Sequence, residues 1–384
     1  MSATLSGLSR RGQVPVFQAT RVLAAANALE AAGRDIVHLE VGQPAGGAPQ
    51  VAVAAAQAAL GTHPLGYTES LGVPDLRRGI AALYGRRYGL DLDPGRVIVT
   101  TGSSAAFLLA FLALFDAGAR VGVVEPGYPA YRNMLGALDL VPVALPVDGA
   151  TGFNPMPQHL AAAGKLDGLL VASPANPTGA MLDGAALGSL VDATRARGIR
   201  LISDEIYHGI SYGKPAVTAL SLDREAVVVS GFSKYFGMTG WRIGWMIVPA
   251  ALVPTVDRLA QNFFISAPSL SQIAACAALE AEEELDARVA VYARNRALLA
   301  EALPRLGFRD VLVPDGAFYL YSSLPAGETD SEAFCARLLD ERGIALTPGT
   351  DFDPVRGRGT VRFSFAGAHA RIVEAVRRLE AAPL

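Results

Sequence analysis

Lysine, cysteine and net charge are all scarce in this sequence. Of its 33 basic residues only three are lysines, Lys165, Lys214 and Lys234, and the others are arginines. Charged residues make up 18% of the chain, and the formal net charge is −3. A chain without a basic surplus has no electrostatic footprint for nucleic acid. We therefore expect small-molecule ligands, with any anion held by a local site.

The two cysteines, Cys276 and Cys335, stand alone in helix-like segments. Neither belongs to a CxxC or Cys/His cluster, so we expect no metal site and two buried thiols in a reducing cytoplasm. The N-terminus lacks the pattern of a secretory signal. The apolar stretch from Thr101 to Phe115 is too short to span a bilayer and is expected to be a buried helix, so no membrane association is predicted.

Hydrophobic residues make up 51% of the chain, and from about residue 96 they recur in short β-branched runs. Several runs are almost continuously apolar, which is typical of strands covered on both faces, and helical patterns such as Ala185–Ala196 separate some of them. The pattern predicts an α/β fold with a mainly parallel seven-stranded sheet flanked by helices. The expected strands are Arg96–Thr100, Arg120–Val124, Leu140–Val147, Gly168–Ala172, Arg200–Ser203, Ala226–Val229 and Ile243–Val248.

A smaller α+β domain is expected in the last third of the chain. One or two long helices are predicted between Leu270 and Leu303, followed by short strands and two more helices. We expect residues 1–45 to form an N-terminal arm and part of this small domain, residues 46–270 the large domain, and residues 271–384 the small C-terminal domain. The later elements are expected at Val311–Val313, Ala317–Tyr321, Asp330–Arg342, Thr360–Phe365 and His369–Ala381.

The segment SGFSKYFGMTGWRIGW, residues 230–245, places Lys234 after an apolar run and a small-residue turn. From this stretch alone two interpretations are open. Lys234 is a solvated surface charge, as Lys165 and Lys214 are expected to be in their turn-rich contexts, or it is an amine that condenses with an aldehyde. A guanidinium stays charged and cannot react in this way, which would explain why no arginine stands here.

Polar residues follow the predicted strands at the points where the strands end. In an open parallel sheet, ligands bind outside these carboxyl ends. Ser103 and Ser104 open a helix and can hold a phosphate, although serine is also an ordinary helix cap. Tyr128 can stack on a planar ring or simply pack in its loop. Asn176 can donate an amide hydrogen bond or serve a turn.

Asp204 directly follows a buried strand, where a carboxylate is costly to desolvate unless a partner such as a protonated ring nitrogen is present. The alternative is a helix cap. Arg242, eight residues after Lys234, can bind a phosphate through two N–H groups. Together, an amine, a carboxylate, an amide, the phenol of Tyr207, a stacking ring and a phosphate cradle describe one ligand, pyridoxal phosphate.

Over nearly its whole length the sequence resembles the fold-type I, pyridoxal-phosphate-dependent aminotransferases of class I/II, the aspartate aminotransferase superfamily. The motifs occur in the expected order: VGQP from Val41, Gly66-Tyr67, TGSSAAF, EPGYPAY, SPANPTGA, SDEIYHGI, SGFSKYFGMTGWRIGW, PDGAFYLY and VRFSFAG. The resemblance implies transfer of an amino group from an L-amino acid to a 2-oxo acid, ping-pong kinetics and a homodimer.

The resemblance also implies the residues that carry the chemistry. Lys234 would form the internal aldimine and move the substrate Cα proton, and Asp204 would keep the ring nitrogen protonated. Asn176 and Tyr207 would bond the ring O3′. Tyr128 would stack on the ring.

For the two anionic groups, the resemblance implies separate binding residues. Arg362 would bind the substrate α-carboxylate, with Gly42 packed beside it. The cofactor phosphate would be held by Ser103, Ser104, Ser233, Arg242 and, from the partner subunit, Tyr67.

The sequence departs from the family pattern in the segment Pro44-Ala45-Gly46-Gly47 and at two single positions. Related bacterial aspartate aminotransferases often have a lysine where this chain has Ser104, and the family often has a phosphate-binding serine where this chain has Gly231. The missing lysine argues against aspartate, so we expect a neutral or hydrophobic substrate. Five aromatic residues could line its pocket or belong to the core: Phe17, Tyr131, Trp241, Phe263 and Phe264.

Three other functions remain open at this point. A lyase or decarboxylase on the same fold would also need Lys234 and Asp204. A transcription regulator with an aminotransferase-like sensor domain would need a basic DNA-binding module, for which the roughly forty residues before Gly42 are too few. A protein that binds the cofactor without turnover would not need this full set of residues.

Overall fold

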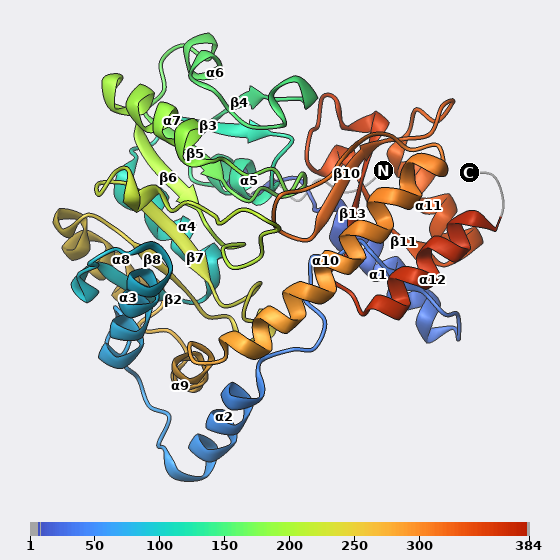
Figure 1. The fold of residues 1–384 in the computed structure, drawn as a ribbon. Coiled ribbons are helices and arrows are strands. Elements are labelled where there is room, and N and C mark those ends of the chain that lie inside the picture. Colours follow the sequence, from blue (N-terminus) through green and yellow to red (C-terminus); the bar gives the residue numbers. More distant parts are fainter. Residues whose placement is uncertain (1–6, 8, 382–384) are drawn as a thin grey trace.

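A seven-stranded sheet forms the centre of the larger part of the molecule (Figure 1). The computed structural model describes residues 7 and 9–381. All neighbouring strands run parallel except β8, which is antiparallel to both β2 and β7. The order across the sheet is β2 (Val97–Thr100), β8 (Gly244–Ile247), β7 (Val227–Gly231), β6 (Arg200–Asp204), β5 (Gly168–Ala172), β3 (Arg120–Glu125) and β4 (Val141–Pro146).

Helices cover both faces of this sheet. One face packs against α4 (Gly102–Leu114), α5 (Ala130–Ala137) and α8 (Val253–Phe263). The other packs against α3 (Pro74–Tyr88), α6 (Pro157–Ala162) and α7 (Gly184–Ala196), with α2 (Gln50–Thr62) and α9 (Ser269–Ala278) packed together beside α3. Every residue of β7 is buried, which explains why the central strands are continuous apolar runs.

The second part of the molecule is a smaller α+β unit. Its antiparallel sheet has the order β12 (Thr347–Pro348), β13 (Thr360–Ser364), β10 (Tyr319–Ser323) and β9 (Arg309–Leu312), and β1 (Val37–His38) pairs in parallel with β11 (Ile344–Ala345). Around these strands lie α1 (Gln18–Ala31), α10 (Glu282–Arg305), α11 (Ser331–Arg342) and α12 (His369–Glu380). The long α10 runs between the two parts (Figure 1).

The predicted fold class is confirmed, and each strand of the large sheet lies within two residues of its predicted bounds. The elements predicted for the smaller unit also lie within two residues of those observed: the strand expected at Ala317–Tyr321 is β10 at Tyr319–Ser323, and the region expected to contain one or two helices contains two, α9 and α10. The short strands β1, β11 and β12 were not predicted. The proposed boundaries of residues 1–45, 46–270 and 271–384 stay a prediction.

Candidate active site

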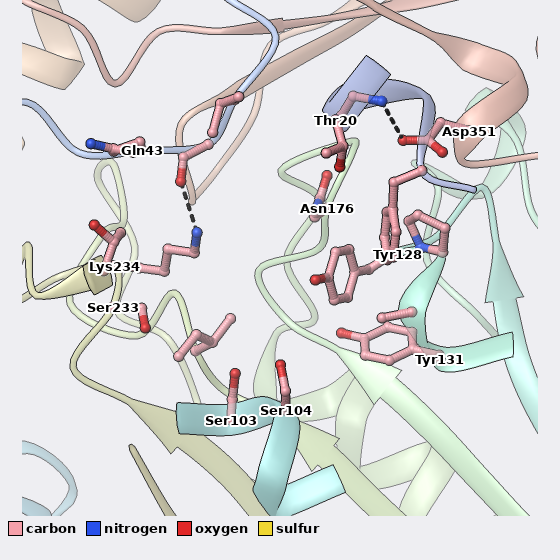
Figure 2. Close-up of a pocket in the computed structure, with 18 of the residues that line it drawn as sticks. Thr20, Gln43, Ser103, Ser104, Tyr128, Tyr131, Asn176, Ser233, Lys234 and Asp351 are labelled. Carbon is pink, nitrogen blue, oxygen red and sulfur yellow. Dashed lines mark hydrogen bonds between the residues drawn. The ribbon is translucent and has the colours of Figure 1, made fainter. Parts of the chain in front are cut away.

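A cavity of about 400 Å³ lies where the carboxyl ends of the large sheet meet the smaller unit (Figure 2). Strand ends place its polar side chains: Asp204 is the last residue of β6, and Lys234 follows β7 by three residues. Figure 2 shows Lys234 on one side of the cavity, Tyr128 on the other, and Ser103 and Ser104 below them.

The structure brings together all of the predicted site residues except Tyr67. The side chain of Tyr67 is 84% exposed and does not line the cavity. Its contribution to a partner subunit therefore stays a prediction. The predicted residues that line the cavity are Gly42, Ser103, Ser104, Tyr128, Asn176, Asp204, Tyr207, Ser233, Lys234, Arg242 and Arg362.

Lys234 is a half-buried amine that faces the cavity, and not a surface charge. Its Nζ donates a 2.7 Å hydrogen bond to the backbone oxygen of Gly42. Burial, with repulsion from Arg362 and Arg242, lowers the pKa of Lys234 to about 8, although attraction to Asp204 opposes the shift. By contrast, the side chains of Lys165 and Lys214 are 84% and 67% exposed. The lysine that the sequence singled out is therefore the one suited to act as a neutral amine.

Asp204 is a buried carboxylate that lines the same cavity, at the end of β6. The hydroxyl of Tyr131 donates to Oδ2, and the backbone N–H of Ile206 donates to Oδ1 at 3.1 Å. Burial raises the pKa of Asp204 to about 6, although these two hydrogen bonds and the charge of Lys234 pull it down. Desolvation disfavours the carboxylate more than its two neutral hydrogen-bond donors stabilise it. A cation placed beside Asp204 would therefore stabilise the ionised form.

A corner suited to binding an anion forms where β2 passes into α4. Gly102 has φ +73° at the first position of α4, and a Cβ there would overlap the guanidinium of Arg242. Glycine is therefore required to bring the start of the helix against Arg242. Ser103, Ser104 and Arg242 all face the cavity, so helix N–H groups, hydroxyls and a cation converge on one place.

Arg362 on β13 is held by hydrogen bonds that its guanidinium donates to three other segments. Its Nη1 donates to Asn176 Oδ1 at 2.8 Å, and its Nη2 donates to the backbone oxygen of Glu40 and to Thr347 Oγ1. Because the Asn176 oxygen accepts from Arg362, its amide nitrogen remains available as a donor toward the cavity.

The guanidinium of Arg362 also lies between two aromatic rings, 4.4 Å from the ring centre of Tyr319 and 4.7 Å from that of Phe352. Its Nε is buried and has no hydrogen-bond partner within residues 7 and 9–381. A stacked, immobile guanidinium with N–H groups toward the cavity is suited to binding a carboxylate in a fixed orientation.

Tyr319 connects several of these groups and was not predicted as a site residue. Its hydroxyl is 2.8 Å from that of Tyr207, and burial raises the pKa of both phenols. A Cβ on Gly42 would overlap the Tyr319 hydroxyl, so Gly42 is required by Tyr319 as well as lying near Arg362. The motif PDGAFYLY contains Tyr319 and Tyr321. The sequence alone does not indicate which of these tyrosines lines a site and which belongs to the core.

The remaining wall comes from segments that sequence reasoning did not place in the site. It contains Ala19, Thr20 and Leu23 of α1, and Glu40, Asp351 and Phe352 of the smaller unit. Of the five aromatics proposed as pocket residues, Phe17 and Tyr131 line the cavity, whereas Trp241, Phe263 and Phe264 do not. Whether each aromatic side chain reaches the cavity depends on packing between segments far apart in the sequence, and no local sequence pattern indicates that packing.

Neither a metal centre nor a membrane span was found in the part of the chain that the structure describes. No group of three or more His, Cys, Asp or Glu side chains there could hold a metal ion. None of its helices combines the length and hydropathy needed to cross a bilayer.

The fold and this set of residues define an enzyme that transfers amino groups, and comparison with known proteins agrees. The family model "Aminotransferase class I and II" matches residues 34–379, so the chain belongs to that family. A valine–pyruvate aminotransferase from Mycobacterium tuberculosis is 48% identical over 374 residues, which cover 96% of each chain.

Solved structures give the same answer. An aminotransferase from Mycobacterium tuberculosis superposes with a TM-score of 0.95 at 48% identity, over 97% of each chain. The aspartate aminotransferase from Thermus thermophilus, solved with maleate, superposes with a TM-score of 0.89 at 32% identity, over 97% of this chain and 98% of that one. The prediction of an aminotransferase of this class is confirmed.

Proposed function

We propose that the chain uses pyridoxal phosphate to move the amino group of a neutral or hydrophobic L-amino acid to a 2-oxo acid in two alternating half-reactions. The main support is that one cavity contains a half-buried amine, Lys234, and a buried carboxylate, Asp204, each with its pKa moved toward neutrality by desolvation. Perturbed ionisable groups that meet in a cavity are characteristic of catalytic sites.

The described residues fit this cofactor. Its phosphate would be held by Ser103, Ser104, Ser233 and Arg242. The buried carboxylate of Asp204 would pair with the protonated ring nitrogen, and that positive charge would in turn stabilise the ionised form of Asp204. Tyr128 would lie against the ring, and the free amide N–H of Asn176 with the hydroxyl of Tyr207 would serve its phenolic oxygen. Bound there, the cofactor supplies an aldehyde that combines with amines and a ring that withdraws electrons.

Lys234 would attach the cofactor and then take and return protons at the substrate Cα. Both tasks require the neutral amine. With a pKa of about 8, roughly one-tenth of the lysine is neutral at pH 7, whereas an ordinary lysine is neutral to only about 3 parts in 10,000. The surroundings therefore raise the reactive fraction by about 300-fold.

The expected selection against a second carboxylate is supported by the charges in the cavity. The cations among its described lining residues are Lys234, Arg242 and Arg362, and each already has a proposed role. The wall contributed by α1 is apolar or neutral, with Ala19, Thr20 and Leu23. The 48% identical relative is named for valine and pyruvate, so we propose valine or a similar amino acid as donor and pyruvate as acceptor.

We further propose that the active unit is a homodimer in the cytoplasm. Large apolar side chains are exposed near the loop that contains Tyr67, including Leu60, Phe263 and Ile265, and a subunit contact would cover them. In that dimer Tyr67 would reach the phosphate of the partner's cofactor. Both cysteines are free thiols, in keeping with a reducing compartment. Sedimentation that gives a monomer mass at micromolar concentration would contradict the dimer.

The absorbance of the purified protein with pyridoxal phosphate tests this function. We expect valine and other neutral amino acids to shift the band of the bound cofactor, aspartate to leave it unchanged, and pyruvate to restore it. If no amino acid changes the band reversibly, the reaction is not transamination, and a lyase or decarboxylase becomes the better assignment. If only aspartate acts, the substrate proposal is wrong.

A further inference from the structure

The N-terminus of α1 is capped by a residue from the other end of the chain. Its own N-cap residue, Phe17, has an apolar side chain that cannot accept a hydrogen bond, and residues such as Asp or Ser are the usual caps. The first N–H groups of a helix have no partners within the helix. Here Oδ1 of Asp351 accepts from the N–H of Gln18 at 2.9 Å, and Oδ2 accepts from that of Ala19 at 3.2 Å.

Asp351 is well placed to hold α1 rigidly. Its side chain is buried, it lies 333 residues from Gln18, and its negative charge faces the positive end of the helix dipole. The guanidinium of Arg132 donates to the backbone oxygen of Asp351, so the cap is itself anchored to the large unit. Figure 2 shows one of the cap hydrogen bonds as a dashed line at Asp351.

The helix that Asp351 holds forms the cavity wall opposite Lys234. Phe17, Ala19, Thr20 and Leu23 all line the cavity, and the ring of Phe17 lies 5.9 Å from that of Tyr128. In Figure 2, Thr20, Tyr128 and Asp351 lie together on the side away from Lys234. A substrate bound through Arg362 and reacting at Lys234 would direct its side chain to this wall.

We propose that Asp351 is a positioning residue for substrate selection: by fixing the first turn of α1, it fixes the wall against which the substrate side chain packs. This inference rests on the proposed function. The γ-carbons of valine would contact the wall and lose part of their burial if α1 shifted, whereas the single methyl of alanine would not. One methylene in a hydrophobic pocket changes discrimination by roughly tenfold or more.

Asp353 provides a matched control. It is equally buried and also accepts backbone hydrogen bonds, at 3.0 Å from Val355 and 2.8 Å from Arg356, and its Oδ2 binds Arg356 Nε at 2.7 Å. These bonds close its own turn, and Asp353 does not line the cavity. Asp351→Ala and Asp353→Ala therefore each remove one buried carboxylate from neighbouring turns. Only Asp351→Ala removes the hydrogen bonds to the first turn of α1.

The experiment uses the cofactor-loaded enzyme and follows its half-reaction with valine and with alanine by stopped-flow absorbance. In Asp351→Ala, we expect the apparent Kd for valine to rise roughly tenfold and that for alanine to stay within about twofold. The absorbance of the bound cofactor should not change, because its binding groups lie elsewhere. Asp351→Asn should be intermediate, since one amide oxygen replaces two acceptors. Asp353→Ala should leave the valine-to-alanine ratio unchanged.

Hydrogen exchange of the α1 peptide separates anchoring from selection. Asp351→Ala should speed exchange in the first turn of α1, and Asp353→Ala should not. The proposal is overturned if exchange is unaltered, or if Asp351→Ala weakens valine and alanine equally. A wild-type enzyme that reacts with neither amino acid refutes the proposed substrate class instead, and the exchange result then still decides whether Asp351 anchors α1.

Discussion

The two sides of the cavity are built in different ways. On the side proposed to bind the cofactor, the cofactor side, Ser103, Asp204 and Lys234 lie at or just beyond the ends of strands of one sheet, and each is positioned by its strand. On the side proposed to bind the substrate, the substrate side, Arg362 is held by Glu40, 322 residues away, and α1 is held by Asp351, 333 residues away. The first side depends on local strand geometry, and the second depends on tertiary packing between the two ends of the chain.

This difference indicates how the work is divided. The sheet side contains the groups whose ionisation matters, Lys234 and Asp204, in surroundings that shift their pKa values. The other side contains a stacked guanidinium and an apolar wall that act by shape and orientation. Variants on the sheet side should therefore change the chemistry of any substrate, and variants on the other side should change which substrate is accepted.

The largest effect is expected for Lys234→Arg. The variant keeps the positive charge but cannot form a bond to an aldehyde or exchange protons, so activity should fall by at least about 10⁴-fold, the upper range for a positioned general base. Steady-state assays with the preferred amino acid measure the loss. Lys165→Arg and Lys214→Arg are matched controls on exposed lysines and should retain wild-type rates.

A Lys234→Arg variant that turned over at the wild-type rate would place the chemistry elsewhere. The bound cofactor should also fail to become covalently attached in this variant. Mass spectrometry after borohydride reduction detects that attachment on the wild-type Lys234 peptide.

The next effect is expected on the substrate side, at Arg362. Arg362→Lys keeps the charge but loses the forked geometry and the stacking between Tyr319 and Phe352. We expect kcat/KM for the amino acid to fall about 10²- to 10³-fold, as for loss of a buried charged hydrogen bond, while cofactor affinity stays unchanged. Arg358→Lys is the control, because that side chain is 70% exposed and pairs with Asp330 at the surface. A loss of cofactor in Arg362→Lys would break the division between the two sides.

The same division explains how much of the site could be predicted from the sequence. Lys234 and Asp204 follow strands whose apolar runs are visible in the sequence, and the carboxyl ends of parallel strands meet at one edge of a sheet. Strand patterning alone was therefore enough to predict that these two side chains meet. Resemblance to the family supplied Arg362, which a single arginine among many would not have revealed.

The substrate wall could not be predicted, for a physical reason. Asp351 acts on Gln18 and Ala19 across the whole chain, and nothing local to the segment PGTDFDP indicates that partner. Likewise, the hydrogen bond from Tyr131 to Asp204 joins the first turn of α5 to the end of β6, which become neighbours only because β5 pairs with both β3 and β6. The two-residue strands β1 and β11 are too short to show an alternating pattern.

A moderate effect on stability is expected for Asp204 on the cofactor side. Its folded pKa of about 6 lies above the ordinary value of 3.8, so the folded apoprotein binds this proton more tightly than the unfolded chain does. The contribution to stability is present below pH 3.8 and is lost as the pH rises through about 6. Two pKa units correspond to about 3 kcal/mol, of which about half is lost between pH 5 and pH 8.

Asp204→Asn removes this titration, so the unfolding free energy of the apoprotein should fall less between pH 5 and pH 8 than in the wild type. Urea denaturation at the two pH values measures the difference, and groups that do not interact with Asp204 cancel because both proteins share them. Burial raises the pKa of Glu205 and repulsion from Asp204 adds to the shift, so the loss of stability at Glu205 should also shrink in the variant, which acts in the same direction. The same variant should bind pyridoxal phosphate more weakly. If the unfolding free energy of the variant apoprotein depended on pH as it does in the wild type, the raised pKa of Asp204 and its cause, desolvation, would be contradicted.

The smallest effect is expected at Tyr319, where the two sides of the cavity meet. Its hydroxyl contacts Tyr207 on the cofactor side, and its ring lies against Arg362 on the substrate side. Tyr319→Phe removes only the hydroxyl, so cofactor affinity should fall about fivefold, the value of one neutral hydrogen bond, while KM for the amino acid stays unchanged. Tyr319→Leu also removes the ring and should raise KM as well.

Tyr212→Phe is the control for losing a tyrosine hydroxyl, because Tyr212 donates to the backbone oxygen of Ala317 at 2.7 Å but does not line the cavity. It should leave both cofactor affinity and KM unchanged. If Tyr319→Phe instead raised KM and left cofactor affinity alone, the hydroxyl would belong to the substrate side and the boundary would run between Tyr207 and Tyr319. If both quantities moved together in Tyr319→Phe, the two sides would be coupled through this one hydrogen bond, and Tyr319 would link substrate binding to the cofactor.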